Sequence, residues 1–449
     1  MQGKSLIRRQ SLKKLKFGLE VELFTLDGEG RMISGAPRLM RRVKRDHPRI
    51  QILKECGKSM VEVISRPDTS IPNTIQRTLE DYESILHSAE KEGMVLYSYG
   101  TYPGSFIPEL SEGEGYNIKE LIFGTQRMHI AARCIGLHCH FCLPWGVFDH
   151  ANRILKSLVN SKNHQSMINL YNLFIAMDPG LTTFTQSSPF YQGRYLGKDS
   201  RVIVYRGGEI FGYPQGLYSN FQEFGGLQAY KHDDMDLAQI ITNRFQSWDR
   251  VIKKIDVNLK AFLKRGSILD TAWNPVKISS HGTLEQRGMD INHPRVILAV
   301  AALIGHISKA VQEKYLNVKP SMAGRSSPFR LEGGTIHIPP HEYVRLRMQP
   351  QAAYEGLADN QVYAYCRNLL KLGKACMPRR ERPLLMPLER MLEERRTVSD
   401  EIVSAAKKMG ISTGERMTNS EAAELALRMS SDLFREIIMT KQLIRGIGD

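Results

Sequence analysis

The sequence lacks the features that mark secreted and membrane proteins. Its 449 residues include six cysteines, too few for a disulfide scaffold, so reduced thiols are expected. No apolar run is long enough to suggest a membrane-spanning helix. The basic N-terminal segment, from Lys4 to Lys16, has no apolar stretch of the kind that a secretory signal requires. We therefore expect a cytoplasmic protein with no membrane partner.

The chain also lacks the signatures of common nucleic-acid-binding modules, although its charge is strongly positive. The formal net charge is +15 and the isoelectric point is near 9.5, which favours polyanions such as nucleic acid or a nucleoside triphosphate. The basic residues are spread along the chain, without an aromatic RNA-binding motif, zinc-finger spacing or a helix-turn-helix pattern. Nucleic acid is therefore the less favoured partner, and a solvated basic surface is the simpler alternative.

The hydrophobic pattern is typical of an α+β protein. Length alone suggests about two or three domains. Period-two patterns predict strands at 17–24, 50–54, 59–65, 94–99, 136–143 and 282–290, and helical patterns occur near 37–45, from 72, at 151–177 and from 294. Residues 105–125 and a basic segment around 194–206 are predicted to be loops, 208–233 a long ordered loop beside a pocket, and the last 90 residues mainly helical.

Three predicted strands carry charged or imidazole side chains on one face and apolar side chains on the other. Alternation places His138 and His140 on one face of 136–143. In the same way, Glu20 and Glu22 share a face of 17–24, and Glu285 and Arg287 share a face of 282–290. Since such groups are costly to bury unless they are paired or hold a metal, the three strands point to a common site.

The residue types favour a hard divalent metal. Glu62 interrupts the apolar run Met60-Val-Glu-Val-Ile64, and clustered carboxylates with histidine suit magnesium or manganese held together with substrate phosphates. Arg287, next but one to Glu285, would meet the remaining phosphate charge.

Plainer interpretations exist for each element. Glu20 and Glu22 could form a solvent-facing strand surface, and His138 and His140 could be hydrogen-bonded core histidines. Zinc bound by His138, His140, Cys142 and Cys139 is a further alternative, although no His-Glu-X-X-His spacing supports a closed zinc site.

Six short motifs resemble those of the type 2 glutamate–cysteine ligases, or carboxylate–amine ligases, and occur in the same order. They span roughly residues 15–310 and read Phe17-Gly-Leu-Glu-Val-Glu22, Met60-Val-Glu-Val-Ile-Ser65, Gly100-Thr-Tyr-Pro103, Gly136-Leu-His-Cys-His140, Ser187-Ser-Pro-Phe-Tyr-Gln-Gly193 and Gly282-Thr-Leu-Glu-Gln-Arg-Gly-Met-Asp290. More distantly, Leu137-His-Cys-His140 and Leu284-Glu-Gln-Arg287 are similar to strands of glutamine synthetase.

The resemblance implies a glutamine-synthetase-like fold, with a curved, mainly antiparallel sheet forming a funnel flanked by helices. It implies a catalytic domain over 15–315 and a mainly helical C-terminal region over 316–449, packed on that domain. The implied reaction couples a carboxylate, with glutamate the leading candidate, to an amine such as cysteine. It consumes ATP and passes through an acyl phosphate. The implied partners are small amino-acid and amine substrates, and we expect a homo-oligomer.

The resemblance also assigns roles to residues. Magnesium or manganese would be held by Glu20, Glu22, Glu62, His138 and Glu285; ATP would be contacted by His140, Arg287 and Lys277; Arg287 and Glu285 would be catalytic. Arg201, with Arg194 or Arg206, would bind a substrate carboxylate.

Two departures from the family pattern concern the substrate. The family's Trp-Asp and nearby arginine are replaced by Trp273-Asn-Pro-Val-Lys277, where Lys277 could substitute, and the family's His-Pro-Phe loop appears as Thr101-Tyr-Pro-Gly104. These changes fit a ligase for a different amino acid, polyamine or peptide. A non-catalytic nucleotide- or RNA-binding protein is the alternative from another class.

Overall fold

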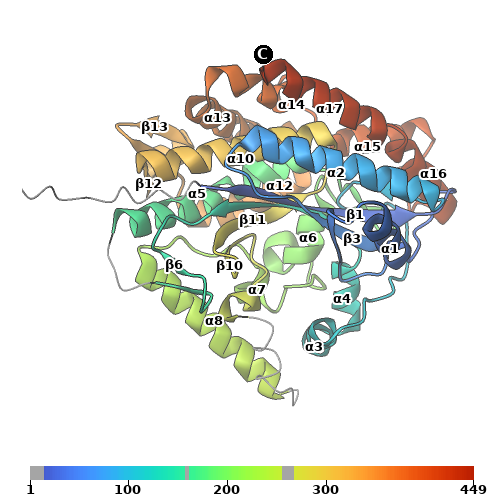
Figure 1. Ribbon diagram of the computed structural model, residues 1–449, viewed down its shortest axis with the longest axis horizontal. Coiled ribbons are helices and arrows are strands. Elements are labelled where there is room, and N and C mark those ends of the chain that lie inside the picture. Colours follow the sequence, from blue (N-terminus) through green and yellow to red (C-terminus); the bar gives the residue numbers. More distant parts are fainter. Residues whose placement is uncertain (1–14, 157–160, 255–266, 449) are drawn as a thin grey trace, which may run out of the picture.

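A seven-stranded antiparallel sheet forms the centre of the computed structural model, which describes residues 15–156, 161–254 and 267–448 (Figure 1). The strand order is β10-β11-β5-β1-β3-β2, with β4 paired to β1. The strands are β1 (Phe17–Leu26), β2 (Gln51–Lys54), β3 (Met60–Ile64), β4 (Val95–Tyr97), β5 (Gly136–Cys142), β10 (Val276–Ser279) and β11 (Thr283–Asp290). Sheet and flanking helices together confirm the predicted α+β class.

Long helices cover the upper face of the sheet in Figure 1. They are α2 (Ile71–Lys91), α10 (Pro294–Lys314) and α5 (Lys162–Thr185), with α1 (Ala36–Asp46) packed beside α2. Ser70 caps α2 by accepting a hydrogen bond from the Asn73 amide, and the predicted apolar stripe of Ile75, Leu79 and Tyr82 is buried. The upper face of the sheet is therefore a continuous apolar core.

Helix α10 alone among the described helices is long and apolar enough, by length and composition, to cross a membrane. The sequence analysis predicted no such segment. Its apolar window is 89% buried, because α5, α2, α13 (Asn360–Cys376) and α17 (Leu433–Gly448) pack around it. A helix that is surrounded by other helices in this way needs apolar side chains around its whole circumference.

Short helices and loops lie below the sheet. The helices are α3 (Glu114–Phe123), α4 (Thr125–Ala131), α6 (Ser200–Arg206) and α7 (Gln222–Gly225), with the longer α8 (Asp234–Lys254) beside them. Since α3 and α6 fall in segments that were predicted to be loops, the prediction of loops at 105–125 and 194–206 is wrong in part. Asp199 begins α6 by accepting from the Val202 amide, a cap that the polar composition of the segment concealed.

Helix α5 begins later, and ends later, than the predicted helix at 151–177. Residues before it contribute the two-residue strands β6 (Phe148–Asp149) and β7 (Ile154–Leu155), and Ser161 caps the helix. The helix then continues through Pro179, beyond its predicted end at Met177. Burial outweighs the proline here: the Tyr365 hydroxyl donates to the Ala176 carbonyl, and a Cβ on Gly180 would lie 2.8 Å from Leu369 of α13.

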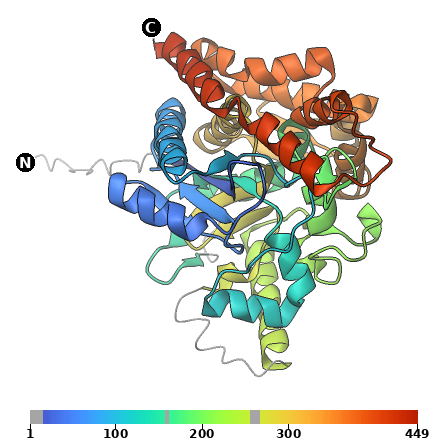
Figure 2. The same cartoon turned by 90° about the vertical axis from the view of Figure 1, so that its right-hand side faces the viewer.

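The C-terminal part is mainly helical, as predicted, but begins with a small sheet of β12 (Asn317–Pro320), β13 (Arg330–Glu332) and β14 (Thr335–Ile338). The further helices are α11 (Met322–Ser326), α12 (Gln349–Glu355), α14 (Met386–Glu394), α15 (Val398–Lys408) and α16 (Asn419–Ser430). In Figure 1, α14 and α17 lie above α10 and contact it, whereas α12 packs on α5 and α6 and α16 packs on β4; Figure 2 shows the same arrangement from the side. The domain boundary at 315/316 stays a prediction.

Candidate active site

The three charged strands lie side by side in the sheet. In the β1–β5 pair Glu20 is opposite His138, and in the β5–β11 pair His140 is opposite Glu285. Directly opposed residues of an antiparallel pair point to the same face. Strand pairing thus brings these four side chains together below the sheet, as the separate motifs predicted.

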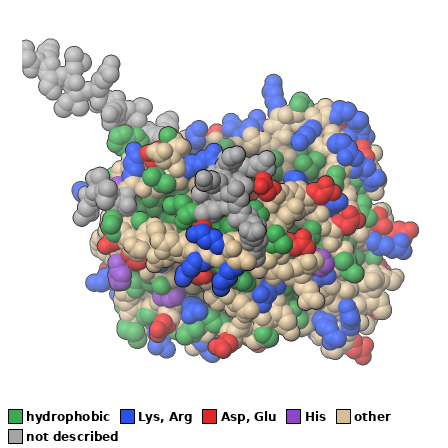
Figure 3. All heavy atoms as spheres, turned by 90° about the horizontal axis from the view of Figure 1, so that it is seen from below, with side chains coloured by type: hydrophobic (Ala, Val, Ile, Leu, Met, Phe, Trp, Pro, Cys, Tyr) green, Lys and Arg blue, Asp and Glu red, His purple; other side chains and the backbone are tan. Residues whose placement is uncertain are grey.

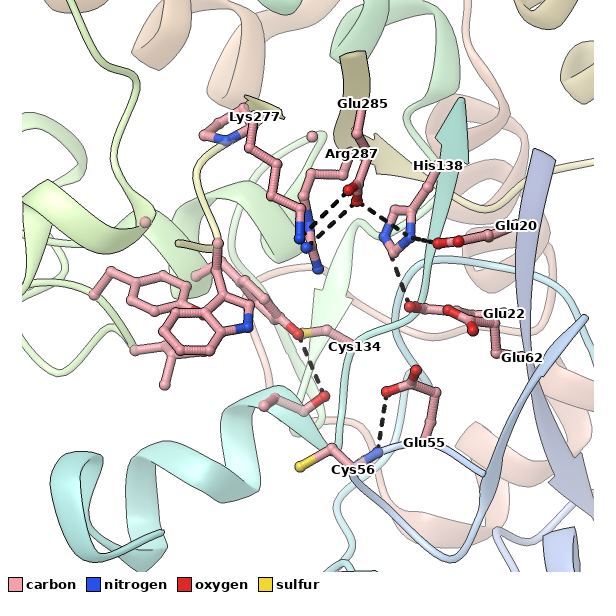
Figure 4. Close-up of a pocket in the computed structure, with 18 of the residues that line it drawn as sticks. Glu20, Glu22, Glu55, Cys56, Glu62, Cys134, His138, Lys277, Glu285 and Arg287 are labelled. Atoms are coloured by element: carbon pink, nitrogen blue, oxygen red, sulfur yellow. Dashed lines mark hydrogen bonds and ion pairs between the residues drawn. The ribbon is translucent and has the colours of Figure 1, made fainter. Parts of the chain in front are cut away.

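A second group of carboxylates extends this site across β3. Glu22 of β1 is opposite Glu62 of β3, and Glu55 directly follows β2. One oxygen from each of these three residues lies within 4.8 Å of the others. Figure 4 shows the three carboxylates along one side of the cavity, next to Glu20 and His138.

Glu20 joins the two histidines. Its Oε2 lies 2.9 Å from His138 Nδ1, and its Oε1 lies 3.1 Å from His140 Nε2. The other His140 nitrogen, Nδ1, is 2.9 Å from the Thr283 hydroxyl, so this ring is fixed from both sides. Such contacts hold each imidazole in one orientation.

Two cations approach the carboxylate of Glu285. Lys277 Nζ lies 3.4 Å from one oxygen, and Arg287 Nη1 lies 3.4 Å from the other (Figure 4). The β5–β11 register shifts by one residue between Gln286 and Met289, which marks a β-bulge. Gly288 lies in this bulge because a Cβ there would come within 2.4 Å of Asp178. The bulge fixes the position of Arg287 at the end of the paired segment.

The carboxyl groups of Glu22 and Glu62, on one side of the cluster, have higher pKa values than those of Glu285 and Glu20 on the other side. Burial, followed by repulsion from Glu55, raises the pKa of Glu22 to about 8, and the same two causes raise the pKa of Glu62 well above its usual value. On the other side burial also opposes ionisation, but Lys277 and Arg287 lower the pKa of Glu285 to about 2. His140 and His138 likewise hold the pKa of Glu20 below its usual value despite burial.

The donor set fits a hard divalent cation. Three groups of side chains bring ligand atoms together: Glu20, Glu62 and His138; Glu20, His140 and Glu285; Glu22, Glu55 and Glu62. The raised pKa values of Glu22 and Glu62 indicate more buried carboxylate than the protein's own cations neutralise, and a bound cation would relieve this repulsion. All five predicted ligands belong to these groups, but their role as ligands stays a prediction.

The cysteines of the zinc alternative do not join these groups. None of the three contains a cysteine in the part of the chain that the structure describes. Cys139 and Cys142 are three residues apart, so the strand directs them to opposite faces, and Cys139 is buried above the sheet. Both are free thiols, as are the other four cysteines.

The carboxylates open into a cavity of about 310 Å³. Aromatic side chains from α3, α6 and the loops also line it, namely Tyr116, Phe123, Tyr205, Tyr218 and Trp273. Tyr218 stacks on Trp273 at 6.4 Å between ring centroids, and Lys119 Nζ lies 5.0 Å from the Trp273 centroid. The cavity thus has a charged wall, formed by the sheet, and an aromatic wall, formed by the helices and loops below it.

Sequence reasoning missed Glu55, Lys119 and the aromatic residues. Glu55 lies outside the strand pattern, although its place just after a predicted strand was a usable signal. Lys119 and Tyr116 belong to α3, which was predicted to be a loop. The predicted loop at 208–233 does border the cavity, through Leu217, Tyr218 and Gly225.

The three candidate arginines have different environments. Arg201 is buried at the cavity, and it donates to the carbonyls of Gly288 at 3.2 Å and Arg287 at 3.4 Å. Arg206 also reaches the lining, but Asp178 binds its guanidinium at 2.6 and 2.8 Å. Arg194 is exposed and lies in a separate groove, so the structure does not bring it to the cavity.

The sequence profile of glutamate–cysteine ligase family 2 matches residues 16–330. The chain belongs to this family. The matched region contains every strand of the main sheet and every carboxylate of the cluster.

Relatives within glutamate–cysteine ligase family 2 are distant. A Corynebacterium jeikeium protein named "Putative glutamate--cysteine ligase 2" is 24% identical over 228 residues, which are 50% of this chain and 52% of the relative. A protein of the same name from Chloroflexus aurantiacus is 25% identical over 191 residues, 42% of this chain and 44% of the relative. The chain thus spans about half the length of the curated relatives it matches.

Solved structures show the same glutamine-synthetase-like ligase fold. The bifunctional glutathione synthetase of Pasteurella multocida aligns with a TM-score of 0.57 at 12% identity, over 94% of this chain and 53% of that one. The glutamate–cysteine ligase of Francisella tularensis, solved with AMP, aligns with a TM-score of 0.52 at 11% identity, over 97% of this chain and 93% of that one. At these identities the likeness concerns the fold alone.

Proposed function

We propose that the protein joins the γ-carboxylate of glutamate to an amine, using ATP and magnesium or manganese. The observation that carries this proposal is the cluster itself. Buried carboxylates and two histidines on adjacent strands face Arg287 and Lys277 across one small cavity. Phosphoryl transfer requires mainly positioning and neutralisation of charge, which this arrangement supplies.

Each part of the cluster has a proposed role. A divalent cation bound by Glu20, Glu22, Glu62, His138 and Glu285, with Glu55 as a further ligand, would neutralise charge on the ATP phosphates. Arg287 and Lys277, held by Glu285, place fixed positive charge beside the transferring γ-phosphoryl group. His140 contacts a phosphate of the nucleotide.

The reaction then follows the acyl-phosphate route. A glutamate carboxylate oxygen attacks the γ-phosphorus, the bond to the ADP oxygen breaks, and a glutamyl phosphate forms. The acceptor amine attacks its carbonyl carbon, phosphate leaves, and the amine loses a proton. Arg201 is the proposed partner of the glutamate α-carboxylate, because it is the candidate arginine in the cavity that makes no direct ion pair among the described residues.

Phosphate release tests this proposal. We expect release from ATP and magnesium to require glutamate together with an amine, and to be lost in Glu285→Gln, whose amide cannot hold the two cations. Lys309→Gln, which alters an exposed i,i+4 ion pair, is the control. Absence of glutamate-dependent release with every amine, in protein that binds ATP, would refute the assignment.

A non-catalytic RNA-binding protein is the second candidate, motivated by the charge of +15. Lys and Arg are interspersed with Asp and Glu over the face drawn in Figure 3, which does not show one continuous basic surface. Steeply salt-dependent RNA binding without ATP turnover would favour this candidate. The cytoplasmic location and the homo-oligomer stay predictions.

A further inference from the structure

A second hollow, the arginine groove, lies against the candidate active site. It measures about 1000 Å³ and is lined by residues of α4, the hairpin of β8 (Phe190–Tyr191) and β9 (Arg194–Tyr195), the loop after α6, and the segment before α16. Figure 2 shows these segments on the side turned to the viewer. Its charged lining consists of Arg127, Arg133, Arg194 and Arg416, with His129 beside them, and no described aspartate or glutamate contributes to it.

These four arginines have no carboxylate partner among the described residues. Arg133 donates through Nε and Nη2 to the Phe106 carbonyl at 3.1 and 2.9 Å, and Arg416 donates to the Ser105 hydroxyl at 3.2 Å. Arg127 lies over the Phe221 ring at 5.9 Å. Two neighbouring residues thus anchor two guanidinium groups, and the Tyr191 hydroxyl is a further hydrogen-bond partner of Arg133. The guanidinium groups of Arg127 and Arg194 make no hydrogen bond or ion pair among the described residues, which leaves them available to an anion. Four like charges that line one groove repel one another, and a bound anion would remove this cost.

Helix α4 separates the arginine groove from the active-site cavity. Its residues Met128 and Ala131 line the cavity, whereas Arg127 and Ile130 line the groove, and Phe123 contributes to both. A helix is about 10 Å across. Phe123 lines both hollows, and it therefore marks the place where a ligand of several residues in the groove would reach the cavity.

The lining favours a peptide over a compact phosphate. Between the arginines lie Ile130, Leu196, Tyr191, Tyr213 and Pro214, which suit the aliphatic part of side chains as well as their charged ends. Planar guanidinium groups match carboxylates in two-point hydrogen bonds. We propose that the arginine groove binds the carboxylates of an acidic peptide whose free amine enters the cavity as the acceptor. This inference rests on the proposed ligase function.

Direct binding tests the groove without requiring turnover. The probe is a hexaglutamate peptide with a free N-terminal amine and a C-terminal fluorophore, followed by fluorescence anisotropy at low salt. We expect Arg127→Gln/Arg194→Gln to weaken binding about tenfold or more, and Arg194→Lys to weaken it less. The control, Arg379→Gln/Arg435→Gln, removes the same charge from exposed positions outside the groove and should change binding by less than about twofold.

Competition identifies the chemistry of the ligand. Unlabelled hexaglutamate should displace the probe, and inorganic tripolyphosphate or a short RNA of equal charge should do so more weakly. Equal weakening in the groove and control variants, no binding by the wild type, or stronger competition by tripolyphosphate or RNA would overturn the proposal. Thermal melting of each variant checks folding. Failure of the ligase assignment would appear separately, as absent phosphate release in a protein that binds the peptide.

Discussion

The two faces of the main sheet differ completely although the same strands build both. In β5, Leu137 and Phe141 point up into an apolar core that α10 covers, whereas His138 and His140 point down into the carboxylate cluster. The upper face gains free energy from burial of apolar area. The lower face buries carboxylates that repel one another, which lowers the stability of the fold. Burial of apolar side chains on the upper face offsets this loss. We infer that stability and chemistry are separated by side of the sheet, and four predictions test this separation.

The largest effect is expected for Arg287→Met on the lower face. Removing the fixed charge proposed to face the transferring phosphoryl group should lower kcat about 1000-fold. Some thermal stability should also be lost, because buried Glu285 keeps only Lys277 as a cationic partner. The measurement is steady-state phosphate release. Arg31→Met, at an exposed arginine paired with Glu29, should leave kcat unchanged. A kcat within about tenfold of the wild-type value, in folded Arg287→Met protein, would contradict the proposed role of the lower face.

On the upper face, Phe141→Ala should lower the free energy of unfolding by about 3–5 kcal/mol, because it leaves a cavity in the core. Urea unfolding measures this change. Leu53→Ala, at a side chain that is 47% exposed on the same sheet, should cost less than about 1 kcal/mol. Equal costs for the two variants would show that the core does not lie where the structure places it.

Glu62→Gln should act in opposite directions on stability and metal binding. Its carboxyl has a pKa far above its usual value through burial and neighbouring carboxylates. A neutral amide should therefore stabilise the metal-free protein by about 1 kcal/mol or more at pH 7. The same variant should bind manganese about tenfold more weakly, as calorimetry would show. Destabilisation of the metal-free protein would argue against a repelling cluster.

A pH dependence of the free energy of unfolding is expected from Glu22. Its folded-state pKa of about 8 lies above the usual 4.5, so the folded protein holds the proton more tightly than the unfolded chain. The tighter binding of this proton stabilises the folded protein fully below pH 4.5. The stabilisation is lost as the pH rises toward 8, by at most about 1.4 kcal/mol for each pH unit. Metal-free Glu22→Gln should show a flatter pH profile in urea unfolding. A profile identical to that of the wild type would exclude Glu22 as its source.

Strand faces could be predicted from the sequence because alternation is a local rule. Glu20, His138 and Glu285 each lie on the predicted face, and antiparallel pairing then brings them together. The bulge before Met289 could not be predicted, since it depends on how β11 meets β5. Glu55 and Lys119 come from segments without a periodic pattern, and only the folded chain places them at the cavity.

Helix ends were harder to predict for a related reason. The buried α5 continues through Pro179, where local propensity favours a stop, because tertiary packing outweighs that propensity. Of all the features, the residues that determine substrate specificity were the hardest to predict from the sequence. Arg194 has no sequence property that separates it from Arg201, yet one lines the arginine groove and the other the cavity.

The register of β1 against β5 and β3 has a consequence for how this site can change over evolutionary time. Ligand positions follow the strand repeat, so a carboxylate cannot move by a fraction of that repeat. A shift of one residue would turn Glu20 and Glu22 into the apolar layer. The proposed metal-binding arrangement can therefore be kept or lost, but not gradually adjusted. The loops and short helices below the sheet carry no such restriction, and diversification toward new acceptors is open to them alone.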